Sequence, residues 1–244
     1  MRGRPPFSYV CLSPRTNLSV TTSERLAWLS APSIVATALY YVLPSTVQDM
    51  TVVQFIPQLL AYSALALWAS TNPGWVTRLG LTRTLIPQGY RWGVPTGVIL
   101  GSLNVAAILW LVPSFGSDIL FLRETPHARI PTLVMVPWLI LLIAAGVEIN
   151  FRGFLLGRLL AWFAEKLPKR HCTIQVATAV GLSALTFSFD PFMVATFKHL
   201  HWIAVWDGIV WGALWTWLRN LYVPIVAHAV EVIVMYSVVK LSLS

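Results

Sequence analysis

Charge and cysteine are both scarce in this chain. Only 11% of its 244 residues are charged, whereas soluble globular domains carry about 25%. Two cysteines, Cys11 and Cys172, are too few for a disulfide framework, and we expect them to be free thiols. The first 25 residues lack an apolar core of signal-peptide length, so we expect a cytosolic leader there rather than a cleaved signal. These absences exclude both an ordinary soluble domain and a disulfide-stabilised secreted one.

Hydrophobic residues, by contrast, make up 57% of the chain, and the mean hydropathy is +0.70. These values are typical of a polytopic membrane protein whose main partner is the lipid bilayer. The net charge of +8 would suggest nucleic acid in a soluble protein. Here the basic residues lie mostly in loops between apolar segments, as the topology bias of membrane proteins requires. We therefore expect no nucleic-acid partner.

The apolar segments predict an all-α transmembrane bundle, since a span needs about 20 predominantly apolar residues. Seven segments qualify or nearly qualify: 26–43, 53–70, 93–112, 131–156, 174–189, 200–218 and 221–240. Arginine and lysine are concentrated in alternate loops, which predicts a cytoplasmic N-terminus. The chain then divides into a leader (1–25), N-terminal transmembrane helices (26–130) and a C-terminal core (131–244).

The fourth segment contains the most informative residues. Glu148 and Arg152 lie four residues apart inside an apolar helix, where each charge costs roughly 2.5 to 3.5 kcal/mol. Their spacing and order favour an ion pair on one helical face. Such a pair either locks helices together or marks a functional cavity.

Other ionisable residues follow in the last three segments, while the first three carry only neutral polar groups. His228 and Glu231 share a face of the seventh segment, and Asp207 lies well inside the sixth. His199 and His201 fall near a membrane boundary, where solvated histidines are ordinary. No HExxH motif occurs, and the HAVE run at 228–231 offers only half a metal site, so we expect no cofactor and no metal.

Two stretches resemble one known family. VEINFRGFLLGRLL (147–160) resembles the EExxxR motif of the CAAX-protease and bacteriocin-processing (CPBP) family of intramembrane proteases. GALWTWLRNLYVPIVAHAVEV (212–232) resembles a later segment of the same family. The two stretches occur in the family's order and cover its core domain.

The resemblance implies a peptidase in which a glutamate and a histidine activate water and further polar groups stabilise the oxyanion. Residue by residue, it assigns catalytic roles to Glu148, Arg152 and His228. The family's FxxxH motif has two registers here, and the one that pairs Phe197 with His201 is the literal match. His199, Asp207 and Glu231 are alternative or supporting groups.

Two family positions depart from the pattern. Val147 replaces the first glutamate of the paired motif, and Val232 replaces the asparagine of HxxxN. Two interpretations are therefore open. One is an active intramembrane endopeptidase of the glutamate/histidine type that cleaves a membrane-embedded or lipid-linked, for example prenylated, peptide. The other is an inactive relative that binds a protein partner, as an immunity or scaffold component does. In both, we expect an integral protein of the plasma (inner) membrane of a bacterium.

Overall fold

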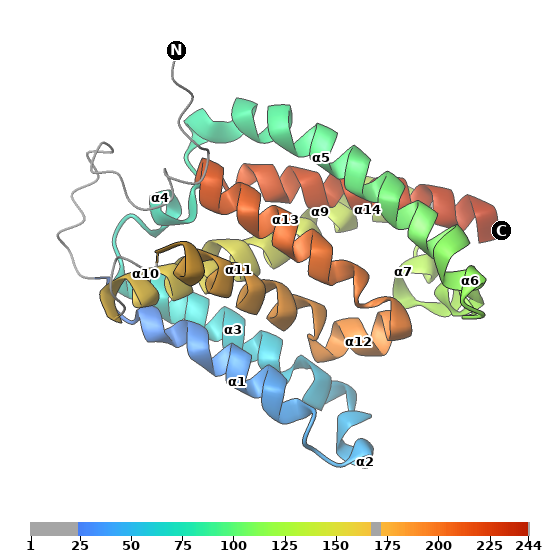
Figure 1. Cartoon of the computed structure of the whole chain (residues 1–244), viewed down its shortest axis with the longest axis horizontal. Coiled ribbons are helices and arrows are strands. Elements are labelled where there is room, and N and C mark those ends of the chain that lie inside the picture. Colours follow the sequence, from blue (N-terminus) through green and yellow to red (C-terminus); the bar gives the residue numbers. More distant parts are fainter. Residues whose placement is uncertain (1–23, 167–171, 244) are drawn as a thin grey trace.

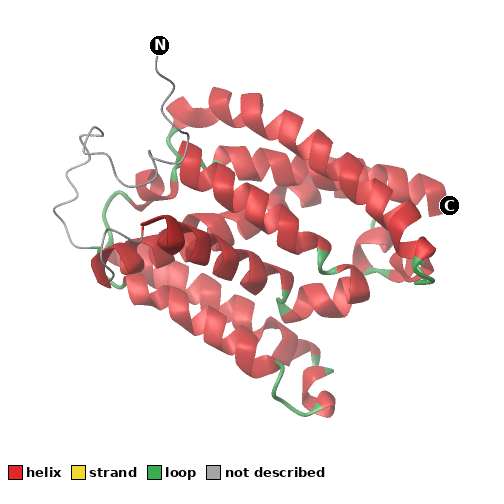
Figure 2. Cartoon of the chain, viewed as in Figure 1, coloured by secondary structure: helices red, strands yellow, loops and turns green. Residues whose placement is uncertain are grey.

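The computed structural model describes residues 24–166 and 172–243, so most of the predicted leader lies outside the described residues. Within these ranges every regular element is a helix and no strand occurs (Figure 2). The predicted all-α class is therefore confirmed. The α-helices are α1 (Ala31–Tyr40), α2 (Ser45–Gln48), α3 (Thr51–Thr71), α4 (Trp75–Leu79), α5 (Ile86–Ala106), α6 (Val112–Ser114), α7 (Pro126–Arg129), α8 (Thr132–Val134), α9 (Ile140–Glu148), α10 (Gly157–Lys166), α11 (Cys172–Ser188), α12 (Pro191–Phe197), α13 (Ile203–Leu218) and α14 (Tyr222–Leu243).

Each of the seven predicted spans overlaps helical structure, but the helices differ in length. Four continuous helical stretches of the described chain are long and apolar enough to cross a membrane: 51–71, 75–114, 132–166 and 222–243. A fifth candidate is the pair α11 and α12, which bends by 54° between them. The apolar helices 27–40 and 203–218 are shorter. The protein is an integral membrane protein, while the count of seven spans and the cytoplasmic N-terminus stay predictions.

Large apolar side chains cover much of the outer surface. Leu133, Trp110 and Leu142 are 86, 73 and 66% exposed, as expected for side chains that contact lipid. Inside the bundle, by contrast, Trp68, Phe154 and Trp215 are at most 2% exposed and belong to one hydrophobic core.

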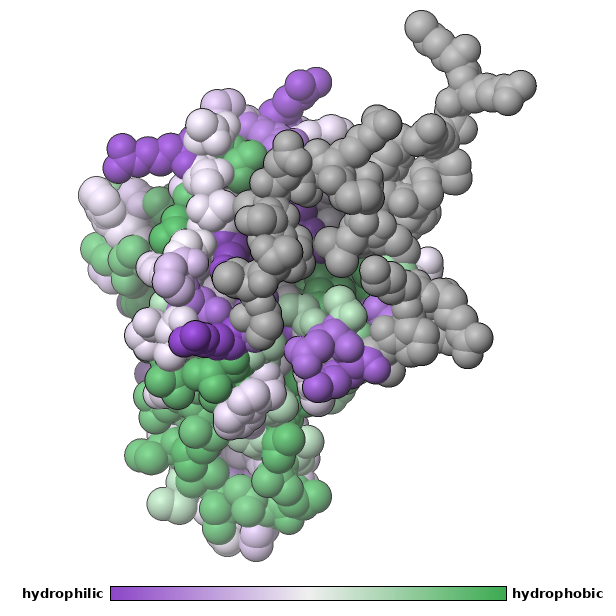
Figure 3. All heavy atoms as spheres, turned by 90° about the vertical axis from the view of Figure 1, so that its left-hand side faces the viewer, coloured by the Kyte–Doolittle hydropathy of each residue, from purple (hydrophilic) through white to green (hydrophobic). Residues whose placement is uncertain are grey.

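Basic connections gather at one end of the bundle. Arg78, Arg158 and Arg219 are near enough to one another to interact electrostatically, and the amide of Leu221 donates a hydrogen bond to the carbonyl of Gly80. Figure 3 views this end, where hydrophilic residues lie above a hydrophobic area. The charges that the sequence assigns to alternate loops thus converge in space, as one side of a membrane requires.

Glu24, at the end of the predicted leader, is anchored at this same end. Its carboxylate accepts a hydrogen bond from Trp68 Nε1 at 2.8 Å and pairs with Arg158.

At the first turn of α11, Cys172 is disulfide-bonded, so the expectation of a free thiol is wrong there. A count of two cysteines excludes a framework but not a single bond. Cys11 lies outside the described residues.

Helices α5 and α14 lie side by side along much of their length (Figure 1). Their contact is a stripe of glycines at every fourth position of α5, namely Gly89, Gly93, Gly97 and Gly101. A Cβ atom at Gly93 would lie only 2.7 Å from Cβ of Val226, and one at Gly97 would clash with the carbonyl oxygen of Ala227. Small residues at this spacing let membrane helices approach closely, and here they fix the helix that carries His228 and Glu231.

Candidate active site

The fourth predicted span changes its helical form directly after Glu148. From Ile149 to Leu156 the backbone is a π-helix, and all its residues from Asn150 onward are buried. π-helical turns are rare and are found frequently at functional sites. The wider turn begins between the two charged residues of the motif, so it sets how the side chain of Arg152 lies relative to that of Glu148.

Glu148, Arg152 and His228 form a connected buried group. The side chains of Glu148 and Arg152 are fully buried, with 3.3 Å between Nε and Oε2. The other carboxylate oxygen of Glu148 lies 2.9 Å from Nδ1 of His228 on α14. One carboxylate therefore holds a cation from its own helix and an imidazole from another.

Aromatic rings enclose this group. The guanidinium of Arg152 lies 4.6 Å from the ring centre of Phe187 and 5.0 Å from that of Trp211, and Trp211 stacks on His228 at 4.4 Å. Such desolvated cation–π contacts are worth about 2 kcal/mol. Gly208 gives the guanidinium room, since a Cβ there would lie 3.0 Å from Nη2.

A cavity of about 890 Å³ lies beside this group, bounded mainly by apolar side chains. His228, Asp207 and Glu231 line it, whereas Glu148 and Arg152 are not among the described residues that do. His228 thus separates the carboxylate of Glu148 from the cavity. Glu148 contacts the lining residue His228 directly.

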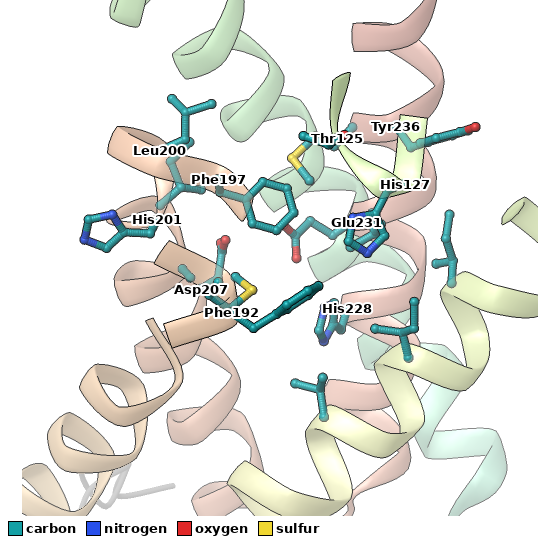
Figure 4. Close-up of a pocket in the computed structure, with 18 of the residues that line it drawn as sticks. Thr125, His127, Phe192, Phe197, Leu200, His201, Asp207, His228, Glu231 and Tyr236 are labelled. Carbon is teal, nitrogen blue, oxygen red and sulfur yellow. The ribbon is translucent and has the colours of Figure 1, made fainter. Parts of the chain in front are cut away.

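Asp207 and Glu231 meet at a second polar point on the same cavity (Figure 4). Both carboxyl groups accept hydrogen bonds from Nδ2 of Asn104, at 2.9 and 2.7 Å. Nε1 of Trp206 donates to Oδ1 of the same amide at 2.9 Å. Asn104 is one of the neutral polar groups of the first three apolar segments, and nothing in its local sequence distinguishes it from other buried amides.

The histidines at 199 and 201 do not join His228. Nδ1 of His201 lies 2.6 Å from the carbonyl oxygen of Lys198, and Figure 4 shows its ring turned away from Asp207 and His228. His199 is exposed and packs on Phe121 at 5.3 Å. Both registers of the second motif reach the cavity, since Phe187, Phe197 and His201 all line it. In the register that begins at Phe187, Pro191 occupies the histidine position.

Asp190, directly before that proline, caps α12 by accepting from the amide nitrogen of Phe192 at 3.1 Å. Nε2 of Gln58 on α3 donates to it at 2.8 Å. Asp190 lines the same cavity. The N-terminal helices thus supply two amides, from Gln58 and Asn104, to carboxyl groups of the C-terminal half.

Both family positions that carry valine line the cavity. Val147 and Val232 present apolar surface where the resemblance expects a carboxylate and an amide. Within residues 24–166 and 172–243, no three His, Cys, Asp or Glu residues cluster closely enough to hold a metal ion.

Comparison with known families gives a match over the C-terminal half of the chain. A family model described as type II CAAX prenyl endopeptidase Rce1-like matches residues 129–234, which include Glu148, Arg152, Asp207, His228 and Glu231. No curated protein and no solved structure matches the chain. The resemblance found in the two sequence stretches is confirmed.

Proposed function

We propose, from the membership of residues 129–234 in the Rce1-like family of CAAX-type intramembrane proteases, that this protein is an intramembrane endopeptidase. Its proposed substrate is a membrane-embedded or lipid-linked peptide, for example a prenylated one. The observation that carries the proposal is the contact between Glu148 and His228 at the wall of a large, mainly apolar cavity.

The contact determines which ring nitrogen of His228 faces the carboxylate. Because the Glu148 carboxylate only accepts hydrogen bonds, Nδ1 of His228 must carry the proton that bridges them. Nε2 is then the free base, and it can take a proton from water in the cavity. Glu148 stabilises the imidazolium that forms, and Arg152 pairs with the other oxygen of Glu148.

This arrangement divides the roles differently from the family resemblance, which assigns the water to a glutamate. Val147 offers no carboxylate and Glu148 is fully buried, so the base that can reach water is the imidazole. The proposed hydrolysis uses no metal and no cofactor. The proposed location is the plasma (inner) membrane of a bacterium.

Cleavage of a quenched fluorescent peptide, in prenylated and unmodified forms, tests the proposal with the purified protein in liposomes. We expect His228→Ala and Glu148→Gln to lower kcat by at least about 10²-fold, the usual scale for general-base catalysis. Glu165→Gln is the matched control, because the side chain of that glutamate is 60% exposed and pairs with the exposed Lys166. Full activity of His228→Ala would refute the proposal.

A second function is favoured by the two valines in the cavity wall, since they remove two polar groups on which the family's chemistry depends. In this alternative the protein is inactive and its cavity binds a partner. Val147→Glu and Val232→Asn restore both groups at positions that line the cavity. Cleavage by the double variant but not by the natural chain would establish the alternative. Cleavage by the natural chain would refute it.

A further inference from the structure

Asp207 and Glu231 are the two carboxyl groups in the cavity that the proposed proton path leaves unused. They come from different helices, α13 and α14, and each residue is only 3% exposed. Oδ1 of Asp207 and Oε2 of Glu231 receive no hydrogen bond from any donor in the described part of the chain. Two carboxyl groups of cavity-lining residues thus each keep one buried oxygen that no donor occupies.

Asn104 fixes how these groups lie. Nε1 of Trp206 can only donate, so the amide atom that faces it must be the oxygen. Nδ2 then points its two hydrogens at the two carboxyl groups, one to each. The amide nitrogen has no hydrogen left. It therefore holds the two carboxyl groups side by side and donates nothing to their other oxygens, Oδ1 of Asp207 and Oε2 of Glu231.

The charges nearby do not balance two carboxylates. Arg152 is the cation that acts on the pair, but its Nε already faces Glu148. His228 turns its Nδ1 to Glu148 and is a cation only if both of its ring nitrogens carry a proton. The carboxyl groups of Asp207 and Glu231 both accept from one nitrogen atom, Nδ2 of Asn104, so their oxygens lie close together. Like charges this close do not both ionise.

We propose that Asp207 and Glu231 share one proton and form the hydrogen-bond donor that polarises the scissile carbonyl of a substrate in this cavity. The proposal rests on the proposed endopeptidase function. The pair supplies a hydrogen-bond donor at a place where the neighbouring residue on α14, Val232, offers none. A carboxylic acid kept neutral in an apolar site can serve as such a donor.

In the proposed hydrolysis, water adds to the scissile carbonyl and the C–N bond then breaks. A water oxygen forms a bond to the carbonyl carbon, and the proton of that water passes to Nε2 of His228. The shared carboxyl proton turns toward the carbonyl oxygen and stabilises the negative charge that develops there. The C–N bond breaks as the imidazolium gives its proton to the leaving amine. The pair ends the cycle with its own proton, and the products are a carboxylic acid and an amine.

Infrared spectroscopy tests the shared proton without any substrate. The difference spectrum between the natural protein and Asp207→Asn/Glu231→Gln should contain the C=O stretch of one protonated carboxyl group, shifted in D₂O. The exposed control, Glu165→Gln, should give no such band. If the difference spectrum of the double variant lacks the band, the shared proton is refuted, whether or not the protein cleaves peptides.

Kinetics test the second half of the proposal. Glu231→Gln keeps an N–H donor, whereas Glu231→Met does not. We expect kcat to fall about 10²- to 10³-fold in the methionine variant, the scale of losing one oxyanion donor, with KM unchanged and a partial recovery in the glutamine variant. Equal kcat in Glu231→Met and the natural chain would refute the donor role while leaving the endopeptidase function standing. Failure of the natural chain to cleave would instead refute that function, and the infrared result would be unaffected.

Discussion

Exchange of Glu148 for glutamine removes one charge from a pair that has no contact with solvent. The side chains of Glu148 and Arg152 are both 0% exposed, so water does not replace the lost partner. The guanidinium would be left buried against Phe187 and Trp211. The shape of the side chain hardly changes, and the effect is therefore one of charge.

The magnitude follows from these contacts. Removal of one partner from a buried ion pair costs about 3–5 kcal/mol. The two aromatic rings still attract the cation, each by up to about 2 kcal/mol when desolvated, and the glutamine oxygen still accepts a hydrogen bond. We therefore expect Glu148→Gln to lower the free energy of unfolding by about 3 kcal/mol, the low end of that range.

A double-mutant cycle separates charge from packing. Arg152→Met removes the stranded cation while keeping an unbranched apolar stem, so Glu148→Gln/Arg152→Met contains no buried charge at either position. We expect the double variant to be about 1–2 kcal/mol more stable than Glu148→Gln alone. Unfolding in mixed micelles, followed by tryptophan fluorescence, measures both free energies. If the double variant is the less stable of the two, the argument from an uncompensated charge is wrong.

Three further predictions concern packing and pH. Gly97→Ala should lower the free energy of unfolding by about 1–3 kcal/mol, because the added Cβ would meet the backbone of Ala227. Unfolding in micelles measures this free energy, and an unchanged value would contradict the close approach of α5 and α14. Gly181→Ala is its matched control, since nothing lies within 4 Å of that Cβ, and the same assay should show a gain of up to about 1 kcal/mol. Burial lowers the pKa of His127 below 6.5. As the pH falls, the unfolded chain therefore binds a proton before the folded protein does, and stability should fall below about pH 6.5. His127→Phe should flatten this part of a curve of Tm against pH, and an unchanged slope would contradict the prediction.

The sequence predicts the helices and the polar residues of the C-terminal half well. Apolar segments of sufficient length locate the long helices but not short ones such as α2 and α4. Buried charge is costly enough that Glu148 and Arg152 stand out without any alignment. Their i,i+4 spacing also predicts the ion pair that the structure contains. These features depend on local sequence, and helical periodicity is a local property.

The partners of these residues could not be predicted in the same way. Asn104 meets Asp207 and Glu231 from more than a hundred residues away, and an amide in an apolar helix carries no local sign of its partner. The second motif is a similar case. Its literal match at Phe197 and His201 lines the cavity, but Nδ1 of His201 faces the carbonyl of Lys198, whereas Phe187 packs against His228. Tertiary geometry decides both cases.

The glycine stripe of α5 has a consequence for where this protein can be divided. Helix α5 lies upstream of the matched segment 129–234, yet it supplies Asn104 and the surface on which α14 rests. An expressed fragment that begins at residue 129 would expose the backbone side of α14 to lipid and leave two acidic groups without their common amide. The smallest working unit of this protein therefore begins no later than Ile86.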